Sequence, residues 1–219
     1  MKKKILLPAA ALVLLAILSG CAPKKNTVTI LYTNDIHTYV NNMVTEEDGS
    51  EHPGMNYGKI AAMKKDLQAA GETVLLVDAG DHLQGTAYGA LDEGRAITDL
   101  MNAAGYDLAT PGNHEFDYGL FRFFSSMAKA KFPYISCNFY EVSTESPLLQ
   151  PSYVVQCGDK KVAFVGISSP ETMYSTTPRY FQDAAGMPTV STEGCPLAAY
   201  ENYLLNYEDA FGSGRITVK

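Results

Sequence analysis

Three short polar clusters hold most of the residues in this sequence that could perform chemistry. They are Asn34-Asp35-Ile36-His37, Asp78-Ala79-Gly80-Asp81-His82-Leu83-Gln84-Gly85 and Gly112-Asn113-His114-Glu115-Phe116-Asp117. Carboxylate, imidazole and amide groups are the side-chain donors that bind divalent ions. Asp35 and His37 are two residues apart, so in an extended segment both point to the same side and can bind one ion. Asp81 can bridge two ions, and Asn113 can offer its oxygen to the second.

Two bound metal ions beside a histidine suit the hydrolysis of a phosphate ester. The ions neutralise the phosphoryl oxygens and activate water at neutral pH. His114 can then stabilise the transition state and protonate the leaving oxygen. Asp117, three residues on, can hold the His114 ring and keep it charged. The alternative is that His114 only caps the start of a helix.

Two other histidines receive a different interpretation. In an extended chain His82 points away from its neighbour Asp81, so we expect a solvent-exposed or supporting group rather than a metal ligand. His52 lies in the polar loop at residues 41–54 and is expected to be a plain surface residue.

Each polar cluster follows a predicted strand. The strands are expected at residues 27–32, 73–77 and 106–109, with helices at 57–70, 95–104 and 118–131. Further strands are expected at 133–137 and 161–167, and residues 153–156 are expected to pair with the latter. This alternation predicts an α/β layered domain. Ligands of such sheets bind at the carboxyl ends of the strands, so the three clusters should converge there. Glycines at 80, 85 and 112 allow sharp turns close to the metals.

The first residues predict export and lipid anchoring. Three lysines at positions 2–4 precede an apolar run at residues 5–18. This run is shorter than the roughly 20 residues that span a bilayer, and its flanks fit a signal peptide. The run ends in Leu18-Ser19-Gly20-Cys21, which predicts a lipoprotein signal peptide at 1–20, lipidation of Cys21 and a tether at 21–26. The protein would then be held at a bacterial membrane, at the cell surface or periplasmic face. An ordinary signal peptide with a chance cysteine is the alternative.

Charge and cysteine content limit the possible partners. Removal of the signal peptide takes three lysines and changes the net charge from −7 to −10. An acidic chain is a poor partner for polymeric nucleic acid, but it can bind a small phosphate ester, because bound metal ions invert the local charge. Cys137, Cys157 and Cys195 match no zinc motif; we expect small buried or tolerated residues, and the sequence leaves their disulfide pairing open. The oligomeric state is open as well.

Taken together, the three clusters resemble the motifs of the calcineurin-like metallophosphoesterases. The Asn-His-Glu-Phe-Asp form and the stretch at residues 30–37 resemble the 5'-nucleotidase branch in particular, and the resemblance covers about residues 27–185. It implies a β-sandwich flanked by helices and the hydrolysis of nucleotides outside the cytoplasm. It also implies Asp35, His37, Asp81 and Asn113 as ligands of two divalent ions (Mn, Zn, Co or Mg), and His114 with Asp117 as a catalytic dyad. Thr38 and Pro111 depart from the usual pattern.

One departure from the family is larger. Family members take further metal ligands from a Gly-His and a Gly-His-x-His segment, and no histidine follows His114 in this sequence. We therefore expect a partial metallophosphoesterase domain at 27–185, a weak second metal site held by Asp81 and Asn113, and impaired activity. Residues 186–219 resemble the C-terminal end of a 5'-nucleotidase substrate domain, or are an unrelated tail. The alternative function is a non-catalytic, truncated surface lipoprotein. The substrate could be a nucleoside monophosphate, a cyclic nucleotide, a nucleotide sugar or another phosphate ester.

Overall fold

The computed structural model describes residues 27–192. The predicted signal peptide, the tether, Cys21, Cys195 and most of the predicted tail lie outside the described residues. Within residues 27–192, none of the helices combines the length and the apolar character needed to cross a membrane.

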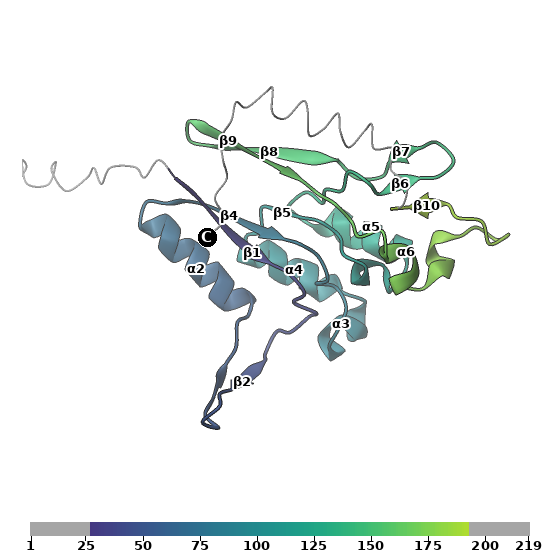
Figure 1. Ribbon diagram of the computed structural model, residues 1–219. Helices are drawn as coiled ribbons and strands as arrows, with labels where there is room; N and C mark the ends of the chain where they lie inside the picture. The colour runs from purple at the N-terminus through teal and green to yellow at the C-terminus, as the bar shows by residue number, and fades with distance from the viewer. Residues whose placement is uncertain (1–26, 193–219) are drawn as a thin grey trace, which may run out of the picture.

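A three-stranded parallel sheet carries the N-terminal half of the described chain (Figure 1). Its strands, in spatial order, are β1 (Val28–Thr33), β4 (Thr73–Asp78) and β5 (Leu108–Ala109). β1 and β4 pair from Val28 opposite Thr73 to Thr33 opposite Asp78, so the two strands end side by side. Parallel strands need crossover connections, and helices supply them here. The predicted α/β alternation is therefore confirmed.

The central strand of this sheet is the most apolar. Val74, Leu75 and Leu76 of β4 are all buried, as expected for a parallel strand that is covered on both faces. The core continues through the aromatic residues that follow the sheet, among them Phe116, Phe123, Tyr134 and Phe139. Because the ends of the strands are fixed by this core, the loops that follow them start from rigid positions.

The crossover helices match the predicted helices closely. They are α2 (Tyr57–Ala69) and α4 (Arg95–Ala104), and α5 (Leu120–Lys129) follows β5. The short α3 (Ala87–Asp92) was not predicted. The Asn56 side chain accepts a hydrogen bond from the Lys59 N–H at 3.0 Å and so caps the start of α2. α4 ends at Gly105, which adopts a φ of 79°. α5 is shorter than predicted, because Gly119 is not helical and Ala130 is extended.

The second half of the described chain forms small antiparallel sheets. The hairpin of β8 (Ser152–Cys157) and β9 (Lys160–Val165) was predicted from the sequence and turns at Gly158. A three-stranded sheet has the order β10 (Val190–Ser191), β6 (Tyr140–Glu141) and β7 (Ser146–Pro147). Short helical turns complete the described elements: η1 (His114–Phe116), α6 (Thr172–Ser175) and η2 (Pro178–Phe181).

Two predicted segments are different in the structure. The strand expected at 133–137 is reduced to isolated bridges, one between Ala109 and Tyr134 and one between Ile135 and Gln150. The loop expected at 41–54 contains a hairpin of two short strands that extends away from the sheet (Figure 1), β2 (Met43–Thr45) and β3 (Glu51–Pro53). Cys137 and Cys157 are both buried, as expected.

Candidate metal centre

Three loops meet beyond the carboxyl ends of β1, β4 and β5. Backbone hydrogen bonds join the first two loops: the Asp35 N–H donates to the Gly80 carbonyl at 3.1 Å, and the His37 N–H donates to the Asp81 carbonyl at 2.9 Å. The third loop joins through Asp81, whose Oδ1 accepts from the His114 N–H at 2.8 Å. The convergence expected from the sequence is therefore seen in the backbone itself.

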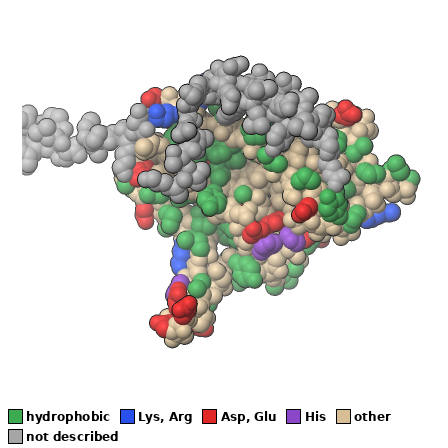
Figure 2. Space-filling view, viewed as in Figure 1, with side chains coloured by type: hydrophobic (Ala, Val, Ile, Leu, Met, Phe, Trp, Pro, Cys, Tyr) green, Lys and Arg blue, Asp and Glu red, His purple; other side chains and the backbone are tan. Residues whose placement is uncertain are grey.

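Side-chain nitrogen and oxygen atoms that could bind a metal ion lie close together where these loops meet. One donor atom each from His37, Asp81 and His114 lies within 4.8 Å of the others. Asp35 joins them, because its Oδ1 lies 3.5 Å from His37 Nε2. The His37 and His114 rings meet edge to face, with their centroids 4.9 Å apart. Figure 2 shows acidic and histidine side chains gathered side by side on this face of the molecule.

The hydrogen bonds of His37 leave one ring nitrogen available to a metal ion. His37 Nδ1 lies 3.0 Å from the Gln84 carbonyl oxygen, which can only accept a hydrogen bond. A proton must then be on Nδ1, so in the neutral ring it is Nε2, the nitrogen that faces Asp35, that carries the lone pair. Metal-binding histidines commonly donate their second ring N–H to a carbonyl or carboxylate in this way.

The backbone at this centre adopts an unusual conformation. Asp35, His37 and Asp81 have φ values of 54°, 47° and 59°. Non-glycine residues rarely adopt this left-handed region, and strained backbone of this kind clusters at functional sites. The side chains of Asp35 and His37 were expected to converge because the segment is extended; that reason is wrong. They converge because both residues turn the chain, held by the hydrogen bonds to the second loop.

Glycines allow the loops to approach this closely. A Cβ added at Gly80 would collide with the backbone of Gly112, and one added at Gly112 would collide with the Asp81 carboxylate. Gly85 likewise lies against the His37 carbonyl, at a φ of 152°. The expected role of these three glycines is confirmed.

His114 and Asp117 form a hydrogen-bonded pair at the edge of the centre. His114 begins the 3₁₀ turn η1, and residues three apart in such a turn lie one above the other. His114 Nδ1 therefore meets Asp117 Oδ2 at 2.6 Å, while Asp117 Oδ1 accepts from Thr176 Oγ1 at 2.7 Å. Burial lowers the pKa of His114, but the hydrogen bond and charge of Asp117 outweigh it, so the pKa lies above the ordinary value. The histidine side chain thus binds a carboxylate and not its own turn.

Asn113 lies directly before η1, next to His114. Its side chain makes no hydrogen bond that caps the turn. Its predicted role as a ligand of the second ion stays a prediction.

Glu115 connects the second and third loops from the buried side of the centre. This role was not predicted from the sequence. Its side chain is buried, and its Oε2 accepts hydrogen bonds from the N–H groups of Asp81 at 2.8 Å and Gly112 at 2.6 Å. Its Oε1 accepts from His82 at 2.7 Å and from Leu83 at 3.1 Å. One carboxylate therefore satisfies four backbone donors. No sequence signal identifies it, since all of these partners except Gly112 lie more than 30 residues away.

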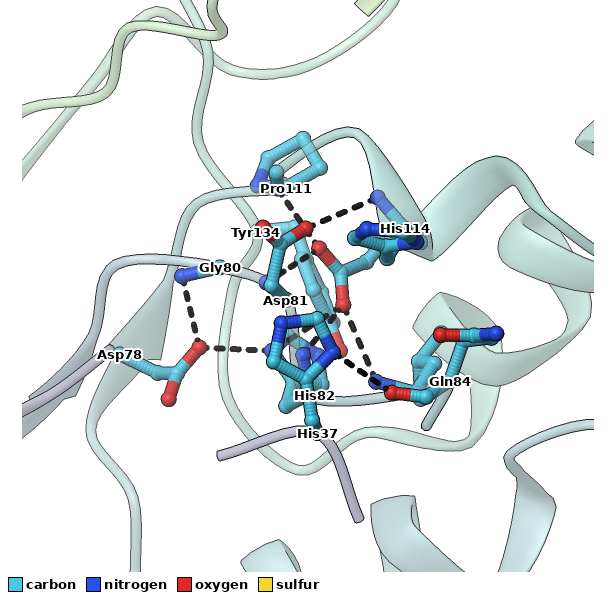
Figure 3. A network of polar contacts seen from close by, with 12 residues as sticks. His37, Asp78, Gly80, Asp81, His82, Gln84, Pro111, His114 and Tyr134 are labelled. Atoms are coloured by element: carbon cyan, nitrogen blue, oxygen red, sulfur yellow. Dashed lines mark hydrogen bonds and ion pairs between the residues drawn. The ribbon is translucent and has the colours of Figure 1, made fainter. Parts of the chain in front are cut away.

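His82 lies with Glu115 and Asp78 in a buried layer of polar side chains beneath the metal-binding loops (Figure 3). Its side chain is fully buried, with Nδ1 2.6 Å from Asp78 Oδ1 and Nε2 2.7 Å from the Tyr134 hydroxyl. Burial lowers the pKa of His82, but Glu115 and Asp78 outweigh it and raise the pKa to about 9. Of the two roles expected for His82, the solvent-exposed one is wrong and the supporting one is right. His52 is exposed, as expected, and pairs with Glu46 at 2.7 Å.

The donor set fits a divalent cation. Burial and the nearby charge of Glu115 raise the pKa of Asp81, and a hydrogen bond with the Asp35 carboxyl raises it further. Two acidic side chains that face each other in this way offer a position for a positive ion. Carboxylate oxygens with imidazole nitrogens suit Mn²⁺, Zn²⁺ and related metals. Fold and donor set together define a candidate divalent-metal centre, of the kind expected for a metal-dependent phosphoesterase.

Comparison with known proteins agrees with this class. The family model described as calcineurin-like phosphoesterase matches residues 28–185, and the chain belongs to this family. The family and fold class expected from the sequence are therefore confirmed. The relatives include several 5'-nucleotidases, as expected.

Three relatives illustrate the similarity and its extent. A snake venom 5'-nucleotidase of Gloydius brevicauda is 37% identical over 160 residues, which is 69% of this chain and 27% of that protein. The human 5'-nucleotidase is 35% identical over 181 residues, covering 78% of this chain and 31% of that protein. Protein UshA of Escherichia coli K12 is 32% identical over 160 residues, which cover 73% of this chain and 28% of that protein. The matched part of the chain thus spans between a quarter and a third of the length of these relatives.

Solved structures show the same fold. The 5'-nucleotidase precursor of Thermus thermophilus is 27% identical, with a TM-score of 0.64 over 82% of this chain and 35% of that one. The calcineurin-like phosphoesterase YfkN of Bacillus subtilis is 23% identical and shares the fold. Its TM-score is 0.64, over 84% of this chain and 59% of that one.

Proposed function

We propose that this protein is a metal-dependent phosphoric ester hydrolase of the 5'-nucleotidase type, which acts on nucleotides outside the cytoplasm. The observation that carries the proposal is the gathering of His37, Asp81 and His114 donor atoms within 4.8 Å, with His114 bonded to Asp117. The similarity to 5'-nucleotidases supports a nucleotide as the substrate. Such an activity would serve nucleotide catabolism and the recovery of phosphate or nucleosides.

Asp35, His37, Asp81 and Asn113 are the proposed metal ligands. Divalent ions bound there would offset the negative charge of a phosphoryl group, which otherwise repels an attacking water. Asp35 and Asp81 supply carboxylate oxygens to hold a cation, and His37 supplies Nε2, because its Nδ1 is bonded to the Gln84 carbonyl. Asp81 is shared between the two ions in this proposal.

His114 is the proposed general acid. Its Nδ1 is bonded to Asp117, so only Nε2 is available to a substrate. The raised pKa of His114 favours the protonated ring, which is the form that can donate a proton to a leaving oxygen. Asp117 holds the ring in place, and Thr176 fixes Asp117 in turn.

The number of histidines supports a weak second metal site. The sequence has four histidines, and of these His52 is exposed on the β2–β3 hairpin while His82 is buried below the centre. Only His37 and His114 can therefore reach the metals. This favours a second candidate function, a non-catalytic surface lipoprotein that keeps the fold and binds one ion at most. In both proposals Cys21 carries a lipid that holds the exported protein at the membrane.

A phosphate-release assay tests the proposed function. The full chain is incubated with adenosine 5'-monophosphate and increasing Mn²⁺, beside His114→Ala and the control His52→Ala. We expect phosphate release that rises with Mn²⁺, is retained in His52→Ala and falls by about 10²–10⁴-fold in His114→Ala. Equal rates in His114→Ala and the wild type would contradict the role of His114. A folded wild type that releases no phosphate at millimolar Mn²⁺ would support the non-catalytic alternative.

A further inference from the structure

Two threonines join the short helix α3 to the loop after β1, the first of the three loops at the metal centre. Thr38 directly follows His37 and is fully buried, and Thr86 caps the start of α3. The Thr86 N–H donates to Thr38 Oγ1 at 2.7 Å, and Thr86 Oγ1 donates to the Thr38 carbonyl at 3.0 Å. The two hydroxyl oxygens lie 2.7 Å apart. Because the Thr86 proton goes to the carbonyl, the Thr38 hydroxyl donates the third bond, and the set is closed.

The backbone of the first loop depends on such bonds. Thr38 has a φ of 58°, and His37 before it has a φ of 47°. The left-handed region is costly for residues with a side chain, above all β-branched ones, so two in succession persist only where other contacts fix them. His37 is fixed by its bonds to the Asp81 and Gln84 carbonyls. Within the described chain, the side chain of Thr38 is bonded to Thr86 alone.

The start of α3 also packs directly on these two residues. A Cβ added at Gly89 of α3 would meet Thr38 Cγ2 at 2.6 Å. A Cβ added at Gly85, just before the helix, would collide with the His37 carbonyl. The Thr86 N–H reaches the same carbonyl oxygen at 3.3 Å. The helix start is therefore fitted against the backbone of both His37 and Thr38.

We propose that Thr38 is a positioning residue, which keeps His37 in its metal-binding orientation through the hydrogen bonds to Thr86. The proposal rests on the proposed function, because it assigns a supporting role at the same metal centre. The Asp81 and Gln84 carbonyls fix the N–H and the ring of His37. The Thr38 hydroxyl fixes the chain that follows. Without that hydroxyl the first loop can relax toward ordinary negative φ values, and His37 Nε2 moves away from the other donor atoms.

The substitution Thr38→Val tests these hydrogen bonds alone, because it removes the hydroxyl and keeps the branched shape. Mn²⁺ binding to the folded full chain is measured by titration calorimetry. We expect Thr38→Val to bind Mn²⁺ about 10- to 100-fold more weakly, as is typical when a group that orients a metal ligand is lost. Thr38→Ser keeps the hydroxyl and should bind Mn²⁺ as the wild type does. Equal Mn²⁺ affinity in Thr38→Val and a wild type that binds Mn²⁺ overturns the proposal.

A buried threonine elsewhere provides the matched control. Thr98 of α4 is fully buried, and its hydroxyl has no hydrogen-bond partner within the described chain. Thr98→Val therefore makes the same chemical change without breaking a bond, and Mn²⁺ affinity should stay unchanged. A loss in Thr98→Val equal to that in Thr38→Val would show that any buried threonine has this effect, and would overturn the specific role of Thr38.

Hydrogen exchange of the metal-free chain separates the two proposals. The His37 N–H is bonded to the Asp81 carbonyl at 2.9 Å and reports the first loop, while the Leu76 N–H, bonded to Asp107 Oδ2 at 2.7 Å, reports the core. In EDTA, Thr38→Val should speed exchange at His37 at least about tenfold and leave Leu76 unchanged, since the lost bonds favour local opening. Thr38→Ser should change neither.

Each exchange result decides the role of Thr38. Unchanged exchange at His37, or equal acceleration at His37 and Leu76, overturns the positioning role, because the second result is a general loss of stability. Faster exchange at His37 alone, in a chain whose wild type binds no Mn²⁺, keeps the role of Thr38 in holding His37 and overturns the proposed metal-dependent hydrolase.

Discussion

Replacing Glu115 by glutamine should loosen both metal-binding loops at once. The carboxylate accepts four backbone hydrogen bonds, two on each oxygen. A glutamine has one carbonyl oxygen and one NH₂ group, so two of the four N–H donors would face another donor. The variant changes no volume, and its effect therefore reports the hydrogen bonds and the charge.

The size of the effect follows from the number of orphaned donors. A buried polar group left without a partner costs about 1–3 kcal/mol, so two of them should lower the free energy of unfolding by about 2–6 kcal/mol. With a denaturant slope of about 2 kcal/mol per M, the urea midpoint should fall by about 1–3 M. Loss of the negative charge 3.4 Å from His82 Nδ1 adds to this cost.

Urea unfolding followed by circular dichroism measures this prediction. Glu47 is exposed on the loop between β2 and β3, so Glu47→Gln is the control and should unfold as the wild type does. Calorimetry with Mn²⁺ on the folded variant should show metal affinity reduced about 10- to 100-fold, because the loops that carry Asp81 and His114 are less well held. A midpoint and a metal affinity both equal to those of the wild type would refute the view that Glu115 supports the centre.

Three further changes test other parts of the molecule. Asp117→Asn should reduce phosphate release about 10- to 100-fold with Mn²⁺ affinity unchanged, because only the partner of His114 is altered; a matching loss of Mn²⁺ affinity would show that Asp117 acts through the metal. Tyr134→Phe should lower the free energy of unfolding by about 1–3 kcal/mol, since His82 Nε2 loses its buried partner; an unchanged urea midpoint would contradict this. Cys21→Ser should move the protein from the membrane fraction to the soluble fraction and abolish acyl labelling, and unchanged fractionation would contradict lipidation.

The convergence of the site could be predicted from the sequence because it depends on topology. Once residues 27–32 and 73–77 are interpreted as neighbouring parallel strands, their carboxyl ends must lie at one edge, and the polar residues after them must meet. The glycine at 80 could be predicted in the same way, since only a residue without a Cβ permits close approach of two loops. These arguments need the order of elements and no side-chain detail.

The directions in which individual side chains point could not be predicted, because they depend on the backbone conformation inside the loops. The expectation for His82 assumed an extended chain through Asp81, but Asp81 has a φ of 59° and turns the chain, which buries His82 beneath the centre. Thr176 reaches Asp117 across 59 residues, and no local pattern predicts such a contact. Tertiary packing decides both, and sequence periodicity carries no information about it.

The buried layer explains how the strained backbone of the centre is maintained. Left-handed φ values at Asp35, His37 and Asp81 cost on the order of 1–3 kcal/mol each, and the chain keeps them only if surrounding bonds fix the loops. The Glu115 carboxylate and the backbone bonds from Asp35 and His37 to the second loop supply that fixation. These hydrogen bonds within the protein hold the loops that carry the donor atoms, so folding meets part of the cost of ordering the centre. Metal affinity at this centre should accordingly follow the integrity of Glu115, which contacts no ion, as closely as it follows the ligands themselves.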